Sequence, residues 1–131
     1  MDNASRYFLS CGYEPEPAML VDSQYQIGWC VTIESLSLIY RLEGASLIIC
    51  HIATQGPGDG QNAIFTFMYH VRQLLAAGSG INDARGTFFS TYSQPQVNAL
   101  RQRLMTVLEQ QGAQWQDYLG EPWLVYTLPL N

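Results

Sequence analysis

The chain has 131 residues, is 47% hydrophobic, and carries eleven acidic residues against six arginines and no lysine, for a net charge of −5. This length and apolar content predict one domain with a closed core. The acidic balance, with arginines dispersed along the chain, argues against nucleic acid and against an anionic membrane surface as partners. Protein or small-molecule partners are the classes that remain.

The sequence contains no segment typical of membrane insertion. No run reaches the roughly 18 uncharged apolar residues that cross a bilayer, so we expect a cytoplasmic protein without membrane insertion. The three cysteines and two histidines lack the paired spacings of metal ligands, and we predict neither a disulfide framework nor a metal site. Cys50 is not expected to be a nucleophile, because alternation along a strand turns the neighbouring His51 to the opposite face.

The N-terminal half predicts a short leading segment followed by β-structure. Residues 1–17 are interpreted as a tail or short helix that ends where GYEPEP introduces a glycine and two prolines, and residues 18–131 as a single domain. Residues 46–53 are apolar on both faces, which is typical of a central strand. Three β-rich runs predict an antiparallel meander, at 25–34, 36–44 and 45–53.

The C-terminal half predicts two helices that alternate with strands. Apolar residues at helical spacing predict one helix over 62–77 and a second over 93–112. Strands are predicted at 83–92 and 122–130. The resulting β-β-β-α-β-α-β order predicts an α+β fold, with a single mixed, mostly antiparallel sheet of about five strands and two main helices.

The stretch QGPGDGQNAIF, residues 55–65, places three glycines between the predicted central strand and the predicted helix. Glycines before a helix start can expose backbone N–H groups to an anion. Gln55, Gly56, Gly58 and Gly60 match the Q/R-x-x-G-x-G/A loop of the GCN5-related N-acetyltransferases, whose element order the chain also resembles. That resemblance implies an acetyltransferase-like topology and an alternative function, an acyl-coenzyme A-dependent N-acetyltransferase that binds acetyl-coenzyme A on this loop.

Several residues depart from that family's pattern. Pro57 removes one N–H from the loop, and Asp59 places a negative charge where a diphosphate would lie. Leu108 stands near the position of the family's proton-donating tyrosine. His51 on the central strand is either a base or a buried, hydrogen-bonded core residue, and we favour the second interpretation. We therefore predict a structural turn, no catalytic residue and no cofactor, with acetyl-coenzyme A binding as the alternative.

A second resemblance spans roughly residues 6–128. The runs LSLIYRLEG, GQNAIFTFMYHVRQLL, ALRQRLMTVLEQQGA and GEPWLVY are similar to the LcrR family, the low-calcium-response regulators encoded in type III secretion gene clusters. This likeness lies in element order and in scattered apolar and aromatic residues. It implies cytoplasmic regulation or chaperone-like control of a bacterial type III secretion system through protein contacts, with no enzymatic activity.

Two aromatic residues are predicted to bind the protein partner. Trp115 and Tyr118 lie in the polar stretch GAQWQDYLGEPW, which we expect to be an exposed loop before the last strand. Arg101 and Arg103, two residues apart on a helix, point in different directions and are expected on a solvated face rather than in a shared clamp.

Overall fold

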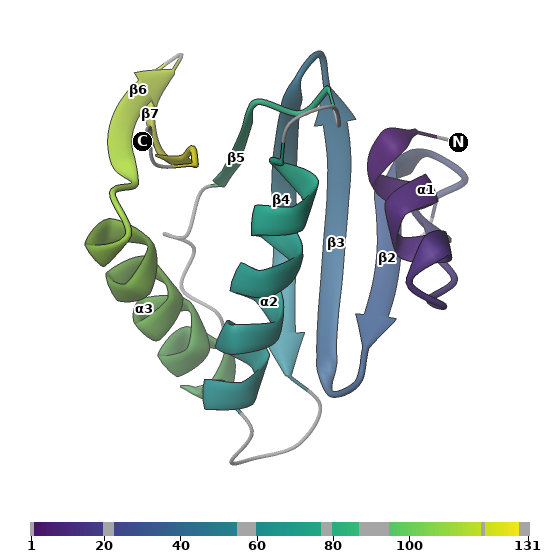
Figure 1. Cartoon of the computed structure of the whole chain (residues 1–131), viewed down its shortest axis with the longest axis horizontal. Helices are drawn as coiled ribbons and strands as arrows, with labels where there is room; N and C mark the ends of the chain where they lie inside the picture. Colours follow the sequence, from purple (N-terminus) through teal and green to yellow (C-terminus); the bar gives the residue numbers. More distant parts are fainter. Residues whose placement is uncertain are drawn as a thin grey trace.

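The computed structural model describes residues 2–19, 23–54, 60–76, 80–86, 95–118 and 120–128. Within these ranges the chain forms an α+β fold of three helices and one seven-stranded mixed sheet, shown in Figure 1. The helices are α1 (Asn3–Ser10), α2 (Gly60–Leu74) and α3 (Pro95–Gln110). The strands are β1 (Glu16–Met19), β2 (Gln26–Ile33), β3 (Leu36–Glu43), β4 (Ser46–Thr54), β5 (Asp83–Gly86), β6 (Gln114–Tyr118) and β7 (Glu121–Tyr126).

The sheet has the strand order β1-β2-β3-β4-β5-β7-β6, which confirms β4 as the central strand. Neighbouring strands are antiparallel except for β4 and β5, whose parallel register joins Ser46 to Asp83 and ends with Ile49 beside Gly86. The crossover between these two strands contains α2, as parallel pairing requires. The second half of β4 therefore extends beyond the paired part of β5.

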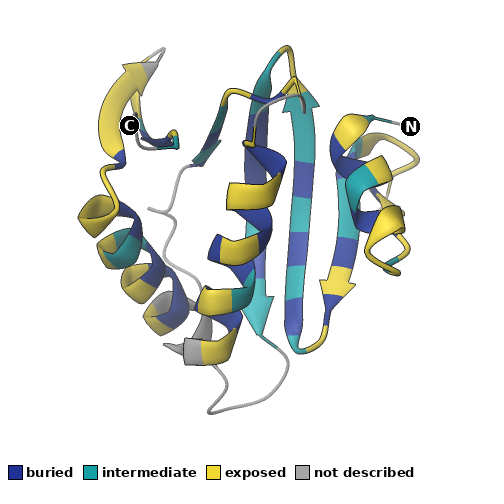
Figure 2. Ribbon diagram, in the orientation of Figure 1, coloured by how far each residue is buried: buried dark blue, intermediate teal, exposed yellow. Residues whose placement is uncertain are grey.

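The three helices share one core with the sheet. Figure 1 shows α2 lying across the middle of the sheet, with α1 on one side of it and α3 on the other. Alternate residues of the strands face these helices, and Figure 2 shows the buried stripes that result. The sheet's share of the core comprises Val31, Ile33, Leu36, Leu38, Tyr40, Leu47, Ile49, Ile52, Ala84, Leu124 and Tyr126.

Two strands were not predicted from the sequence, and both lie at the edges of the sheet. β1 contains Pro17, which cannot donate a ladder hydrogen bond and is tolerated only where one side of the strand is unpaired. β6 is polar, with the sequence QWQDY, and pairs only with β7. The prediction of about five strands was therefore too low, because it did not include β1 and β6. The predicted strand 83–92 is β5 over Asp83–Gly86, and residues 87–94 lie outside the described ranges.

The leading segment, predicted as a tail or a short helix, contains the helix α1, which together with the two predicted main helices gives three. Asp2 caps it, because its Oδ1 accepts a 2.7 Å hydrogen bond from the Ser5 amide. Phe8 is completely buried, and its ring centroid lies 5.3 Å from that of Tyr40 on β3. The helix is thus part of the core rather than a tail.

Polar groups buried beneath α1 are paired. The hydroxyls of Ser5 and Tyr40 lie 2.7 Å apart, and the hydroxyl of Tyr7 lies 2.7 Å from Nδ1 of His70 on α2. Such pairing avoids the cost of an unsatisfied buried group. We call this contact the α1–α2 seam. It is formed by Ser5, Tyr7 and Phe8 of α1, His70 of α2, and Tyr40 of β3 beneath them.

Candidate functional site

The structure leaves most of the glycine loop outside its described ranges. Gln55, Gly56 and Gly58 belong to residues 55–59, which are not described, and Gly60 is the first residue of α2. The predicted context is confirmed on both sides, since β4 ends at Thr54 and α2 follows. Whether this loop binds an anion stays a prediction.

Trp115 lies on an edge strand and not in the predicted loop. It pairs with Leu124 of β7 and is 40% exposed, while Tyr118 pairs with Glu121 at the end of the same hairpin. The side chain of Tyr118 is outside the described part of the chain. The prediction assumed an exposed loop, whereas residues 114–118 form a paired strand. Trp115 is the member of the pair that the structure describes as accessible.

The prediction that Arg101 lies on a solvated face was wrong, because its side chain is buried and only 5% exposed. Its Nη2 lies 3.2 Å from Nδ1 of His51 on β4. Burial, and then the charge of Arg101, lowers the pKa of His51 below its ordinary value. His51 is therefore partly buried and hydrogen-bonded, which is the arrangement that the core interpretation predicts. Arg103, in contrast, is exposed, so the two arginines form no clamp.

Cys50 lies at an irregularity of the β3–β4 pairing, between the positions that oppose Ile39 and Tyr40. Its Sγ is 3.6 Å from Nη1 of Arg41. Burial raises the pKa of the Cys50 thiol, and the nearby guanidinium opposes that shift. A raised pKa keeps the thiol protonated at neutral pH and makes it a poor nucleophile.

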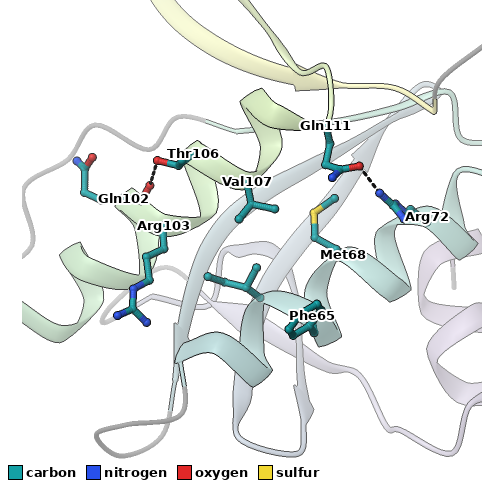
Figure 3. Close-up of a pocket in the computed structure, with 9 residues that line it drawn as sticks. Phe65, Met68, Arg72, Gln102, Arg103, Thr106, Val107 and Gln111 are labelled. Atoms are coloured by element: carbon teal, nitrogen blue, oxygen red, sulfur yellow. Dashed lines mark hydrogen bonds between the residues drawn. The ribbon is translucent and has the colours of Figure 1, made fainter.

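A groove of about 680 Å³ lies between α2 and α3. Figure 3 shows side chains of both helices projecting into it, with Met68 and Val107 in the space between them. We call this hollow the α2–α3 groove. Its lining comprises Ile64, Phe65, Met68 and Arg72 from α2, and Gln102, Arg103, Thr106, Val107 and Gln111 from α3 and the turn that follows it.

The groove follows from the spacing of residues on two helices that run side by side in the same direction. Positions 64, 68 and 72 recur every four residues on α2, as do 103, 107 and 111 on α3 and its following turn, so each set forms one stripe. Arg72 closes one end of the groove by donating to Oε1 of Gln111, and its Nε also donates to the Tyr126 hydroxyl at 3.3 Å.

The charged groups that line the groove are both arginines, Arg72 and Arg103, although the chain as a whole is acidic. Arg103 has no hydrogen-bond or ion-pair partner among the residues that the structure describes. The middle is apolar, with Ile64, Met68 and Val107. An apolar centre with cationic ends can bind an amphipathic group that carries negative charge.

Phe65 and Tyr69 form an exposed aromatic ridge along α2. They are 66% and 60% exposed and lie one helical turn apart. The sequence prediction of a helix over 62–77 used only its apolar residues at helical spacing and missed this ridge. The available signal was the position of two aromatic residues off the apolar stripe, where a helix usually carries polar side chains.

Comparison with known protein families, curated proteins and solved structures found no match to this chain. Among the described residues, no group of three or more metal-ligating side chains lies together, and no helix has the length and apolar character needed to span a membrane.

Proposed function

We propose that this chain is a cytoplasmic regulatory or chaperone-like protein of a bacterial type III secretion system, and that it binds an acidic amphipathic segment of its protein partner in the α2–α3 groove. The secretion context rests on the sequence resemblance described above. The observation that carries the binding mode is the groove, with an apolar centre, an exposed phenylalanine at its rim and arginines at its ends.

The shape of the groove supports a helical segment as the occupant. The groove-lining residues of α2 run from Ile64 to Arg72, about 12 Å along the helix axis, which gives a ligand helix about two turns of contact. Amphipathic helices bind such grooves through residues at i, i+3, i+4 and i+7. Met68 is 7% exposed and lies at the bottom of the groove, where an unbranched thioether can adjust to an apolar partner.

The charge of the groove supports an acidic occupant. Two of the six arginines of the chain line it, and its described lining contains no carboxylate, whereas the whole chain carries −5. A basic segment would gain nothing from Arg72 and Arg103 and would meet two like charges.

Two synthetic peptides test the proposal directly. Both form the same amphipathic helix of about five turns with an identical apolar face, and they differ only in glutamate or lysine on the polar face. We expect the glutamate peptide to bind with a micromolar dissociation constant and the lysine peptide to bind at least tenfold more weakly, measured by fluorescence anisotropy. Equal binding of both peptides, or of neither, would contradict the proposed groove function.

Matched variants locate the binding site. Phe65→Ala and Arg103→Glu should each weaken the glutamate peptide at least tenfold, whereas Tyr25→Ala and Arg6→Glu, exposed residues elsewhere, should leave it unchanged. In the native host, secretion components should co-purify with the Tyr25→Ala variant and be lost with Phe65→Ala. If the recovered partners belong to another system, the secretion context is wrong even though the groove binds.

A second candidate function is acyl-coenzyme A binding, supported by the glycine loop between β4 and α2 and by the short parallel pairing of β4 with β5. Arg103 offers a cation for a phosphate in the same groove. Leu108, near the family's tyrosine position, is buried in the core and carries no proton to donate. Calorimetry with acetyl-coenzyme A separates the two functions. Micromolar binding that displaces the glutamate peptide would favour this candidate over the first.

A further inference from the structure

A second hollow, of about 290 Å³, lies on the other side of the aromatic ridge, where α2 meets the segment after α1 and the β2–β3 turn. We call it the aromatic hollow. Three aromatic residues, two of them from the ridge, form its walls, two buried residues form its base, and one acidic residue stands at its rim. The walls are Tyr13, Phe65 and Tyr69, the base is Ile33 and His70, and the rim residue is Glu34. Thr66 of α2 completes the lining.

The walls are held in place by His70. The ring centroid of Tyr69 lies 5.1 Å from that of His70 with an interplanar angle of 79°, and that of Tyr13 lies 6.0 Å away at 87°. Both tyrosine rings are therefore nearly perpendicular to the imidazole. His70 is only 7% exposed and is fixed from below by the Tyr7 hydroxyl. The hollow is therefore bordered by a cluster of aromatic rings that share His70 as a neighbour.

The rim of the hollow contains a strained acidic residue. Glu34 has a φ of 56°, in the left-handed region that favours glycine. The next turn of the same meander uses Gly44 at a φ of 60° for this purpose. A non-glycine residue in this region costs stability, and such residues cluster at functional sites.

The electrostatics of the hollow favour a positive charge. Burial lowers the pKa of His70, so the imidazole is neutral at pH 7. The negative charge of Glu34 opposes that shift, which means that the Glu34 carboxylate acts electrostatically on the His70 ring at the base of the hollow. Glu34 has no ion-pair partner among the residues that the structure describes. The hollow thus combines aromatic walls with one uncompensated negative charge.

We infer that the aromatic hollow binds an organic cation on an alkyl stem, either a quaternary ammonium group or the head group of an arginine or lysine side chain. Aromatic walls attract such a cation through their quadrupoles, and Glu34 supplies the counter-charge. The stem can lie along Phe65 at the outer edge. The hollow shares Phe65 with the α2–α3 groove, but the inference does not rest on the protein partner proposed for that groove.

Choline and its neutral isostere, 3,3-dimethylbutan-1-ol, test the inference with the full-length chain. We expect choline to shift the NMR signals of labelled tyrosine rings with a millimolar dissociation constant, and the isostere to bind at least about fivefold more weakly. Equal binding of choline and the isostere would show that the hollow does not recognise the positive charge, and would overturn the inference. The absence of binding by any of the cations would overturn it as well. N-acetyl-arginine methylamide and N-acetyl-lysine methylamide identify the source, because tighter binding of either than of choline indicates a peptide side chain.

Variants of Glu34 separate a binding role from a structural one. Glu34→Gln should weaken choline at least about fivefold, and Glu109→Gln, an exposed acid on α3, should have no effect. Glu34→Gly should lose choline binding and yet raise the melting temperature, because glycine adopts this φ without strain. Tyr69→Leu removes one wall and should weaken choline by a similar factor. A Glu34→Gly variant that melts lower and binds choline normally would show that Glu34 acts only in the turn.

Discussion

Where helix α2 meets α1 itself, it packs against the buried ring of Phe8, whereas on its α3 side it borders an open groove of about 680 Å³. In the α1–α2 seam, Phe8 is fully buried and the polar atoms of Ser5, Tyr7, Tyr40 and His70 form hydrogen bonds with one another. Along the groove, Phe65 is mostly exposed and Arg103 has no partner within the described residues.

The difference separates residues that hold the fold from residues available to a ligand. A ring enclosed by its own chain stabilises the protein through lost water contact and close packing. A ring of the same type on the surface contributes little to stability and can contribute to binding. Four predictions test this division, in order of decreasing effect.

The largest contrast should come from two phenylalanines. Phe8→Ala removes a fully buried ring and should lower the free energy of unfolding by about 3–5 kcal/mol. Phe65→Ala should change it by less than about 0.5 kcal/mol. Urea denaturation followed by tryptophan fluorescence measures both. Comparable losses in the two variants would contradict the division.

The seam's hydrogen bond should have a smaller effect. Tyr40→Phe deletes the hydroxyl that lies 2.7 Å from Oγ of Ser5 and should cost about 1–2 kcal/mol, because the Ser5 hydroxyl stays buried without this partner. Tyr25→Phe, at an exposed position, is the matched control and should be neutral. A neutral Tyr40→Phe would mean that the Ser5 hydroxyl finds another hydrogen-bond partner.

Acid should weaken the seam as well. Burial lowers the pKa of His70 from its ordinary 6.5, so the folded state binds fewer protons than the unfolded state below that pH. The free energy of unfolding should therefore fall as pH drops through 6.5, with a slope of at most about 1.4 kcal/mol per pH unit per histidine. His51 contributes in the same direction. His70→Phe should reduce the slope between pH 7.5 and 5.5, and an unchanged slope would exclude His70 as its source.

The smallest effect should come from the closed end of the groove. Gln111→Ala removes the acceptor of the Arg72 hydrogen bond at an exposed site and should cost less than about 0.5 kcal/mol. The same change releases the Arg72 Nη2 group, while its Nε still donates to Tyr126, and should strengthen binding of the glutamate peptide. Weaker peptide binding would indicate that Gln111 itself contacts the ligand.

The sequence predicted the elements whose residues carry a strong repeating pattern. β4 was identified as central because both of its faces are apolar, and α2 because its apolar residues recur at helical spacing. β1 and β6 have no such pattern, since each pairs with one neighbour and needs few apolar residues. Their pairing is a tertiary effect that periodicity does not reveal.

The candidate sites were harder to predict, because they depend on which elements pack together. Arg101 and Arg103 differ by two positions, yet one is buried beside His51 and the other lines the groove. The aromatic hollow joins residues from the segment after α1, a strand turn and α2, which lie far apart in the sequence. Only Trp115, among the predicted partner-binding residues, has a described exposed side chain.

The parallel pairing of β4 with β5 has a consequence for the order of folding. β2, β3 and β4 are joined by two-residue turns and can pair locally. β5 can join β4 only after the α2 crossover has formed. β5 also pairs with β7, which comes from a later part of the chain. Local contacts form faster than distant ones, since less chain entropy is lost on closure. We expect Val31→Ala, in the meander, to slow refolding and Leu124→Ala, on β7, mainly to speed unfolding in stopped-flow measurements. The two antiparallel parts of the sheet would then be assembled one after the other, with α2 setting the interval between them.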